Sequence, residues 1–408
     1  MLNTPFADWP SFTLEEAEAI KEVLLSNKVN YWTGQECRRF EQEFAAWSES
    51  RYAVALANGT MALEVALQAV GIGAGDEVVV SPRSFIASAS TIVRSGGTPV
   101  FADVNRNSQN ITAESIEKAI TSRTRGIICV HLAGWPCDME SIMALADRYG
   151  LYVIEDCAQA HGARYKGRSV GSWGHAAAWS FCQDKIMTTA GEGGMLTTQS
   201  EETWSRAWSY KDHGKSFDAV YNKEHPPGFR WLHDSFGTNG RMTEIQSAVG
   251  RIQLTRMEQW HQARHRNART ILEAAGECPA LRVPDTPDGI EHGWYKCYVF
   301  VEPERLAYGW NRDRIMNEMN RLGVPCGSGS CSEIYREKAF EKIGWKPGKS
   351  LPNSKELGET SLMFMVHPTL TESQISLTCD ALQDVMARAA MKMPATPYDR
   401  QHHHPGLL

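Results

Sequence analysis

The chain has 408 residues with 42% hydrophobic and 22% charged residues, a composition that is typical of a soluble globular protein large enough for two domains. The net charge of -6, without any block of Lys and Arg, argues against a nucleic acid or an anionic membrane as the partner. The start of the sequence resembles no signal peptide, no apolar run reaches the length of a membrane span, and ten scattered cysteines fit reduced thiols, so we expect a cytoplasmic protein.

The first half of the chain alternates between short β-rich runs and amphipathic helical patterns, which predicts a mostly parallel sheet covered by helices. Ligands of such sheets bind at the carboxyl ends of the strands, where polar turns follow the β-rich runs. The expected strands lie within 52–60, 76–82, 98–104, 124–134, 151–157, 176–181 and 193–198, and the expected helices within 61–71, 87–97, 112–120 and 138–150.

The character of the sequence changes near Arg241. Residues 241–276 have helical periodicity with few breakers, and this stretch is long enough to link two domains. Beyond it, the patterns at 294–302, 311–324 and 371–390 indicate a smaller α+β domain. We therefore expect an N-terminal segment at 1–30, a large α/β domain at 31–250 and a small C-terminal domain at 251–408.

Three short motifs and the histidine-rich tail do not support a function. The sequence PGKS at 347–350 lacks the first glycine of a phosphate-binding P-loop, and GIGAGD at 71–76 lacks the spacing of a dinucleotide fingerprint. Cys326 and Cys331 have no Cys or His at zinc spacing, and the histidines at 402–404 fit a solvated terminus. We therefore predict no metal site.

A lysine inside an apolar, glycine-rich run is the most informative feature of the sequence. Lys185 lies in the stretch WSFCQDKIMTTAGEGG and follows an expected strand. Taken alone, this position fits a surface lysine, whose aliphatic stem covers apolar residues, better than it fits a Schiff-base lysine. An acidic residue, Asp156, ends another expected strand, where it fits an N-cap and a catalytic carboxylate about equally well.

These residues and their neighbours meet the demands of pyridoxal phosphate. Lys185 is predicted to hold the aldehyde and move a proton, Asp156 to keep the ring nitrogen protonated, and Gln159 to bind the ring hydroxyl. Gly59 and Thr60 start a helix and, with Ser180, are predicted to bind the phosphate, although a plain capped helix fits the first two as well. Phe85 is predicted to stack on the ring, although a phenylalanine that only packs in the hydrophobic core fits this position as well.

The chain resembles the DegT/StrS-type sugar aminotransferases. The resemblance rests on NGTMALEVAL, IEDCAQAHGARYKGRSVGSWG, SFCQDKIMTTAGEGGML and TNGRMTEIQSAVGRIQL, with further motifs over most of the chain. It implies the aspartate-aminotransferase fold (fold type I) and Lys185 as the lysine of the internal aldimine. It also implies a homodimer with composite active sites, in which Asn239 reaches the phosphate of the partner subunit. Related dehydrating enzymes have histidine at the position of Lys185, so the lysine favours transamination.

The resemblance further implies a ping-pong transamination. L-glutamate would leave as 2-oxoglutarate, and pyridoxamine phosphate would pass the amino group to a nucleotide-linked keto-deoxysugar for a surface polysaccharide or a natural product. A non-nucleotide cyclic ketone as acceptor and a non-catalytic, cofactor-binding regulator are the alternatives. Cys182 and Lys296 stand where family members often have histidine, and the loop GVPCGSGSCSEIY departs from several subgroups, which leaves the sugar open.

Overall fold

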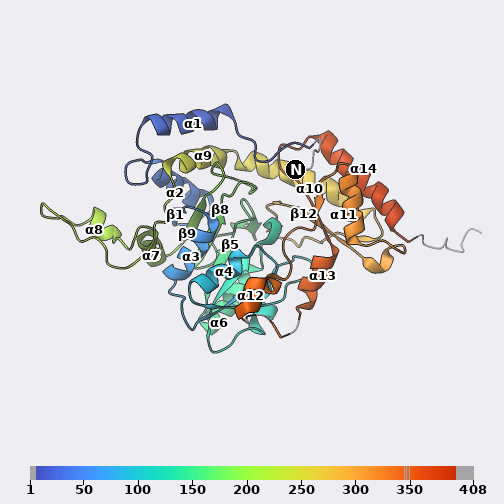
Figure 1. Cartoon of the computed structure of the whole chain (residues 1–408), viewed down its shortest axis with the longest axis horizontal. Coiled ribbons are helices and arrows are strands. Elements are labelled where there is room, and N and C mark those ends of the chain that lie inside the picture. Colours follow the sequence, from blue (N-terminus) through green and yellow to red (C-terminus); the bar gives the residue numbers. More distant parts are fainter. Residues whose placement is uncertain (1–5, 344, 346, 349, 392–408) are drawn as a thin grey trace, which may run out of the picture.

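A seven-stranded sheet forms the centre of the computed structural model, which describes residues 6–343, 345, 347, 348 and 350–391 (Figure 1). Its strand order is β1-β9-β8-β5-β4-β2-β3. Neighbouring strands from β8 to β3 pair in parallel, whereas β9 runs antiparallel to both β8 and β1, so the sheet is mostly parallel as predicted. The strands are β1 (Tyr52–Leu56), β2 (Glu77–Val80), β3 (Thr98–Phe101), β4 (Thr124–Val130), β5 (Tyr152–Asp156), β8 (Ala176–Ser180) and β9 (Gly194–Thr198).

Successive side chains of the strands pack on opposite faces of this sheet. Val78 and Val80 of β2 belong to one hydrophobic cluster with α3, α4 and α7, whereas Val79 lies in a second cluster with α6. This two-residue alternation, with both faces apolar, is what a sheet covered by helices requires. The helices of this unit are α1 (Leu14–Leu25), α2 (Glu36–Trp47), α3 (Gly59–Ala69), α4 (Ala87–Arg94), α5 (Ala113–Glu117), α6 (Met139–Tyr149), α7 (Glu201–Lys211), α8 (Phe217–Tyr221) and α9 (Glu244–Thr255).

A smaller antiparallel sheet of order β10-β12-β14-β13 carries the second core. Helices α10, α11 and α14 pack with it, and a short three-stranded ribbon of order β11-β6-β7 lies outside both sheets. The strands are β10 (Leu281–Arg282), β12 (Cys297–Val301), β13 (Cys326–Gly327), β14 (Ser361–Phe364), β6 (Arg164–Tyr165), β7 (Arg168–Ser169) and β11 (Ile290–Glu291). The helices are α10 (Met257–Gly276), α11 (Arg312–Arg321), α12 (Lys338–Ile343), α13 (Pro352–Thr360) and α14 (Glu372–Ala389).

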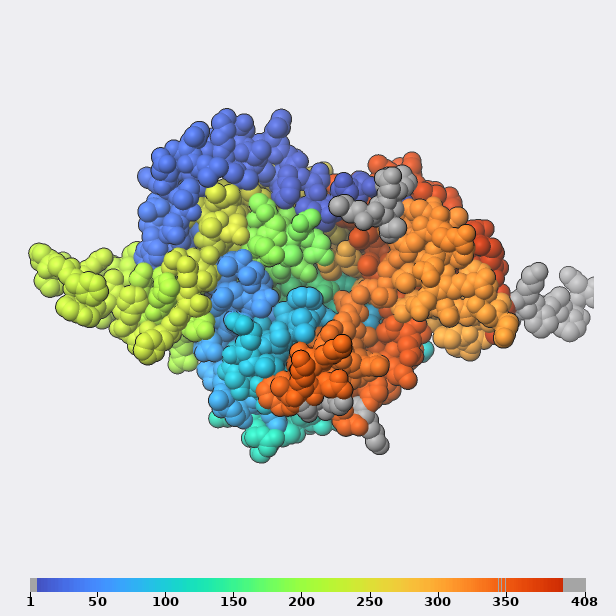
Figure 2. Space-filling model, in the orientation of Figure 1, coloured from blue at the N-terminus to red at the C-terminus, as the bar shows by residue number. Residues whose placement is uncertain are grey.

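The helical stretch expected at 241–276 forms two helices that meet at Arg256. Helix α9 packs on α1 and α2, whereas α10 packs on α14. Residues 334–340 nevertheless return to the large unit, where Phe340 lies 5.7 Å from the Phe101 ring, and Figure 2 shows this orange-red segment against the cyan part of the large unit. The division of the chain near residue 250 therefore remains our proposal.

No helix among the described residues combines the length and apolar character that crossing a membrane would need. All ten cysteines are free thiols, and eight of them are buried, as expected for reduced core cysteines. The histidines at 402–404 lie outside the described residues.

Candidate active site

A cavity of about 1240 Å³ opens where the strands β1, β5 and β8 end. Seven of the eight residues predicted for the cofactor line this one cavity, although they come from distant parts of the sequence. Asn239 is the exception, because it is exposed and pairs with Asp212 in an isolated β-bridge. The residues that the cavity brings together are Gly59, Thr60, Phe85, Asp156, Gln159, Ser180 and Lys185.

Lys185 lies in the turn after β8, and its side chain is only 16% exposed. Its Nζ is 3.8 Å from Asp184 Oδ1 and 5.0 Å from the centroid of the Tyr295 ring. The indole nitrogen of Trp9 donates a 2.7 Å hydrogen bond to the Lys185 carbonyl, so the N-terminal segment holds this turn in place. The amine is thereby held at the cavity wall, as a Schiff-base lysine would require, and its role there stays a prediction.

Asp156 ends β5 and is buried at the floor of the cavity. Its Oδ2 accepts a 2.7 Å hydrogen bond from Ser88 Oγ, which lies 2.9 Å from Ser84 Oγ, and its Oδ1 accepts from the Ala158 amide at 3.2 Å. Burial raises the pKa of this carboxyl above its ordinary value, although its two hydrogen bonds and the charges of Lys185 and His131 oppose the shift. No cation lies at ion-pair distance from it among the described residues, so a protonated ring nitrogen would be a favourable partner, and the site fits pyridoxal phosphate in this respect.

The start of α3 and the end of β8 meet at the other end of the predicted cofactor site. Asn58 caps α3 by accepting a 2.8 Å hydrogen bond from the Met61 amide, so the first two amides of the helix have no partner within it. A Cβ on Gly59 would lie 2.6 Å from Ser180 Cβ, which shows how closely helix and strand approach. The helix amides and the Ser180 hydroxyl form the kind of cradle that binds a phosphate.

Gly59→Ala is expected to weaken cofactor binding because the added methyl group would push the start of α3 away from Ser180. Overpacking of this kind costs about 1–3 kcal/mol, and the phosphate cradle would shift with the helix. Titration of the cofactor-free protein with pyridoxal phosphate measures the effect. Gly276→Ala is the matched control, since a Cβ there meets nothing within 4 Å. Equal cofactor affinity in both variants would contradict this account of Gly59.

Gln159 and Phe85 occupy the positions that a pyridine ring would need. Gln159 is buried, and its Oε1 accepts a 2.8 Å hydrogen bond from the Ala133 amide, so its amide nitrogen is the group left to donate to a ring hydroxyl. Phe85 lines the cavity with 67% of its surface exposed. An exposed aromatic ring in a cavity wall fits a stacking partner and does not fit a core phenylalanine.

Further residues line this cavity. Ser88 reaches Asp156 from α4, and Tyr295 donates a hydrogen bond to Asp184. Glu192, which belongs to the GEGG part of the family motif, lies 3.8 Å from the Cys182 thiol, whose pKa is raised by burial and by that carboxylate. Ser88 and Tyr295 do not stand out in the sequence, because each acts through a contact between distant segments.

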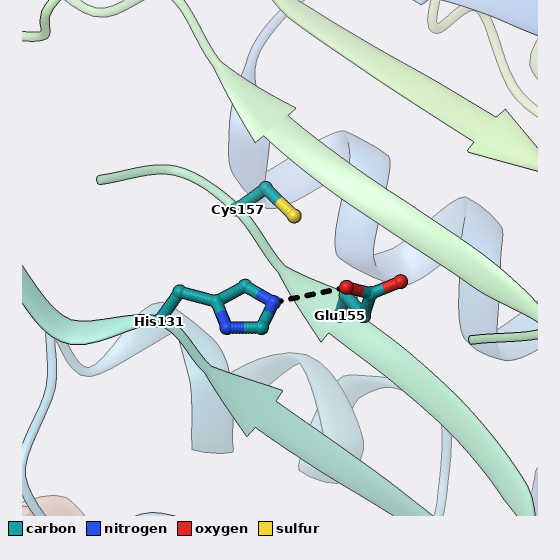
Figure 3. Close-up of side chains that lie close together, drawn as sticks. All are labelled: His131, Glu155 and Cys157. Carbon is teal, nitrogen blue, oxygen red and sulfur yellow. Dashed lines mark hydrogen bonds and ion pairs between the residues drawn. The ribbon is translucent and has the colours of Figure 1, made fainter. Parts of the chain in front are cut away.

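A buried polar cluster lies at the carboxyl ends of β4 and β5, next to Asp156 in the chain (Figure 3). His131 Nε2 is hydrogen-bonded to the Glu155 carboxylate at 3.0 Å. Both oxygens of that carboxylate also accept hydrogen bonds of 2.7–2.8 Å from the backbone amides of residues 171, 173 and 174. Cys157 lies within 4.8 Å of these ligand-type atoms, but burial raises the pKa of its thiol well above the ordinary value. Metal binding requires a thiolate and free carboxylate oxygens, so hydrogen bonding explains this cluster better.

Glu155→Gln is expected to destabilise the fold by about 3 kcal/mol, because one acceptor oxygen becomes an amide that faces backbone donors. The free energy of unfolding in urea measures the loss. Glu140→Gln serves as the control, since the Glu140 ion pair with Lys166 is exposed and such pairs contribute little. If both variants unfold like the unchanged protein, the cluster does not stabilise the sheet edge.

The chain is similar to several known proteins along nearly its whole length. The sequence profile of the DegT/DnrJ/EryC1/StrS aminotransferase family matches residues 10–383. The solved structure of the aminotransferase from Psychrobacter cryohalolentis is 61% identical, with a TM-score of 0.93 over 94% of this chain and 99% of that one.

Two curated relatives add information on the kind of reaction. The spore coat polysaccharide biosynthesis protein SpsC of Bacillus subtilis is 34% identical over 93% of this chain and 96% of its own length. The dTDP-3-amino-3,4,6-trideoxy-alpha-D-glucose transaminase of Streptomyces venezuelae is 32% identical over 94% of this chain and 96% of its own length. One relative is thus named for polysaccharide formation and the other for transamination of a nucleotide-linked sugar.

Proposed function

This chain belongs to the DegT/DnrJ/EryC1/StrS aminotransferase family, and we propose that it transfers the amino group of L-glutamate to a nucleotide-linked keto-deoxysugar. It is a pyridoxal phosphate-dependent aminotransferase with the fold of its family. The observation that carries the proposal is that Lys185 and the buried carboxylate of Asp156 line the same cavity as the start of α3. The amino sugar would serve a surface polysaccharide or a natural product, which the names of the relatives support.

The residues of the cavity divide the work of transamination among them. Bound pyridoxal phosphate supplies an electron sink that stabilises negative charge on the carbon whose proton is removed. Asp156 would keep the ring nitrogen protonated, as this sink requires, and Ser88 orients the carboxylate. Lys185 Nζ would take the proton from the substrate carbon and return it on the cofactor side, which is general acid–base work by one amine. Gly59, Thr60 and Ser180, which line the cavity, would hold the phosphate.

The size of the cavity supports a bulky acceptor. Its volume of about 1240 Å³ exceeds the usual range of roughly 300–1,000 Å³ for small-ligand pockets, so space remains beyond the cofactor and an amino acid. Residues 329–331, in the loop that follows β13, and Met363 also line the cavity. A sugar that carries a nucleotide would use this space, whereas a free cyclic ketone would leave much of it to water.

A homodimer with composite sites is part of the proposal. The segment at 222–238 projects from the body of the subunit on the side of α8, as Figure 2 shows. It exposes Phe229, Trp231 and Phe236, with 77%, 83% and 99% of their surfaces accessible. Asn239 follows this segment and is itself exposed. A second subunit would cover the aromatic side chains, and Asn239 would then be available to the partner's phosphate site.

The visible absorption of the purified protein tests the first half of the proposal. We expect a band of lysine-bound cofactor that disappears when L-glutamate is added and that returns with 2-oxoglutarate. A panel of ketones, each offered with and without its nucleotide, tests the second half. A colourless protein that ignores added pyridoxal phosphate would contradict the cofactor site, and turnover of a free inosose alone would favour the cyclic-ketone alternative. A bound cofactor that no amino donor changes would favour a regulator.

A further inference from the structure

Lys296 lines the cavity, and among the described residues it forms no ion pair with a carboxylate. The residue directly precedes β12 and lines the same cavity as Lys185. Its Nζ lies 3.2 Å from Met365 Sδ, a weak acceptor, and 4.8 Å from the centroid of the Tyr295 ring. Among the described residues no carboxylate oxygen lies at ion-pair distance from it. Since Lys185 Nζ is 5.0 Å from the same ring, the two nitrogens are less than about 10 Å apart.

The surroundings of Lys296 carry an excess of positive charge. Arg264 of α10 is buried behind Tyr295, and its Nε and Nη2 have no hydrogen-bond partner. Burial lowers the pKa of Arg264 to about 9 and that of Lys296 to about 8. The carboxylate of Asp184 opposes this pKa shift at Lys296, whereas the cations Arg264 and Lys185 add to it. Asp184 is the acidic group nearby, but Tyr295 donates to one of its oxygens and Lys185 lies near the other.

An amine that is removed from water and left without an anion is costly unless a ligand supplies the anion. Asp184 offsets this cost only in part, because it lies beyond ion-pair distance of Lys296 and contacts Lys185 and Tyr295 instead. Of the two proposed substrates, L-glutamate carries carboxylates close to its reacting carbon. The ketosugar carries its negative charge on the diphosphate, away from the carbon that receives the amine.

We propose that Lys296 binds a carboxylate of the amino donor and so selects a dicarboxylic amino acid over the sugar in the first half of the reaction. Arg264 adds positive potential behind it without lining the cavity itself. The inference rests on the proposed function, because it assigns the donor subsite of that same cavity. Lys296 is therefore a specificity residue for L-glutamate and 2-oxoglutarate.

The two halves of the reaction, measured separately on the holoenzyme, test this assignment. In Lys296→Met the side chain keeps its length and loses its charge. The concentration of L-glutamate that half-saturates bleaching of the cofactor band is expected to rise roughly 10- to 100-fold. The amination of the nucleotide-linked ketosugar by the pyridoxamine form is expected to stay unchanged. Lys296→Arg retains the charge and is expected to lose less, and Lys21→Met, on an exposed lysine, is the control.

Calorimetric titration provides a readout that needs no turnover. Glutarate, an unreactive dicarboxylate, is expected to bind the unchanged holoenzyme and to lose roughly 10- to 100-fold in affinity in Lys296→Met, whereas dTDP binds both alike. Equal glutarate binding in both proteins, or a loss that falls on dTDP and the ketosugar, would overturn the assignment. If the unchanged protein does not respond to L-glutamate at all, the proposed donor is wrong, and that result is distinct from either outcome in the variant.

Discussion

Lys185→Ala is expected to lower the rate of amino transfer by about 10⁴-fold while the protein stays folded. Positioned acid–base groups contribute roughly 10²–10⁴-fold, and this one amine both holds the cofactor and moves the proton. The side chain contacts Asp184 at 3.8 Å and the Tyr295 ring, so its loss removes no strong structural interaction. Single-turnover bleaching of the cofactor band by L-glutamate measures the rate, and thermal unfolding measures the fold.

A comparison of two lysines makes the result specific. Lys185→Ala should still take up pyridoxal phosphate through Gly59, Ser180 and Asp156, but without the absorption of the lysine-bound form. Lys211→Met offers a contrast, because Lys211 is buried against the Tyr31 ring and Glu41 and lies outside the cavity wall. It should change stability more than the rate per folded molecule. Near-normal bleaching in Lys185→Ala would assign the proton transfer to another residue.

The sequence predicts those site residues that differ visibly from their neighbours along the chain. Lys185 stands out because a charge interrupts an apolar run, and Asp156 because it ends a strand pattern. Gly59 and Thr60 stand at a visible helix start. In each case the local pattern fixes the element, and parallel strands bring their carboxyl ends to one edge of the sheet. The common cavity follows from that topology.

Other features of the site depend on contacts across the fold, which the sequence does not show. Ser88 is one of several small residues in α4, and its hydrogen bond to Asp156 exists because β2 and β5 lie on either side of β4 in the sheet. Arg264 has an ordinary position in a long helix, yet it is fully buried. Lys296 departs from the family pattern, but only the structure shows that the hydrogen-bond partner of its amine is the Met365 sulfur and not a carboxylate. Asn239 is exposed in the isolated subunit, so its predicted role depends on a second chain.

Asp156→Asn is expected to slow both half-reactions by about 10²- to 10³-fold, because the amide cannot stabilise a proton on the ring nitrogen. The substitution keeps the shape of the side chain. Its amide oxygen can accept the hydrogen bond from the Ala158 backbone, and its amide nitrogen can donate to the Ser88 hydroxyl, which can rotate to accept. The loss should therefore appear in the rate of the chemical step more than in cofactor affinity. Stopped-flow bleaching with saturating L-glutamate measures that rate, and an unchanged rate would remove Asp156 from the mechanism.

Ser88→Ala is the graded companion of that variant. The hydrogen bond from Ser88 lowers the pKa of Asp156 against the effect of burial, so its removal raises that pKa further. The ionised carboxylate is the active form, and the acidic limb of the pH–rate profile should consequently move to higher pH, with a maximal rate lower by at most about 10-fold. Asp156→Asn should lose this acidic limb altogether. A profile for Ser88→Ala that coincides with the unchanged protein would show that the hydroxyl has no influence on the carboxylate.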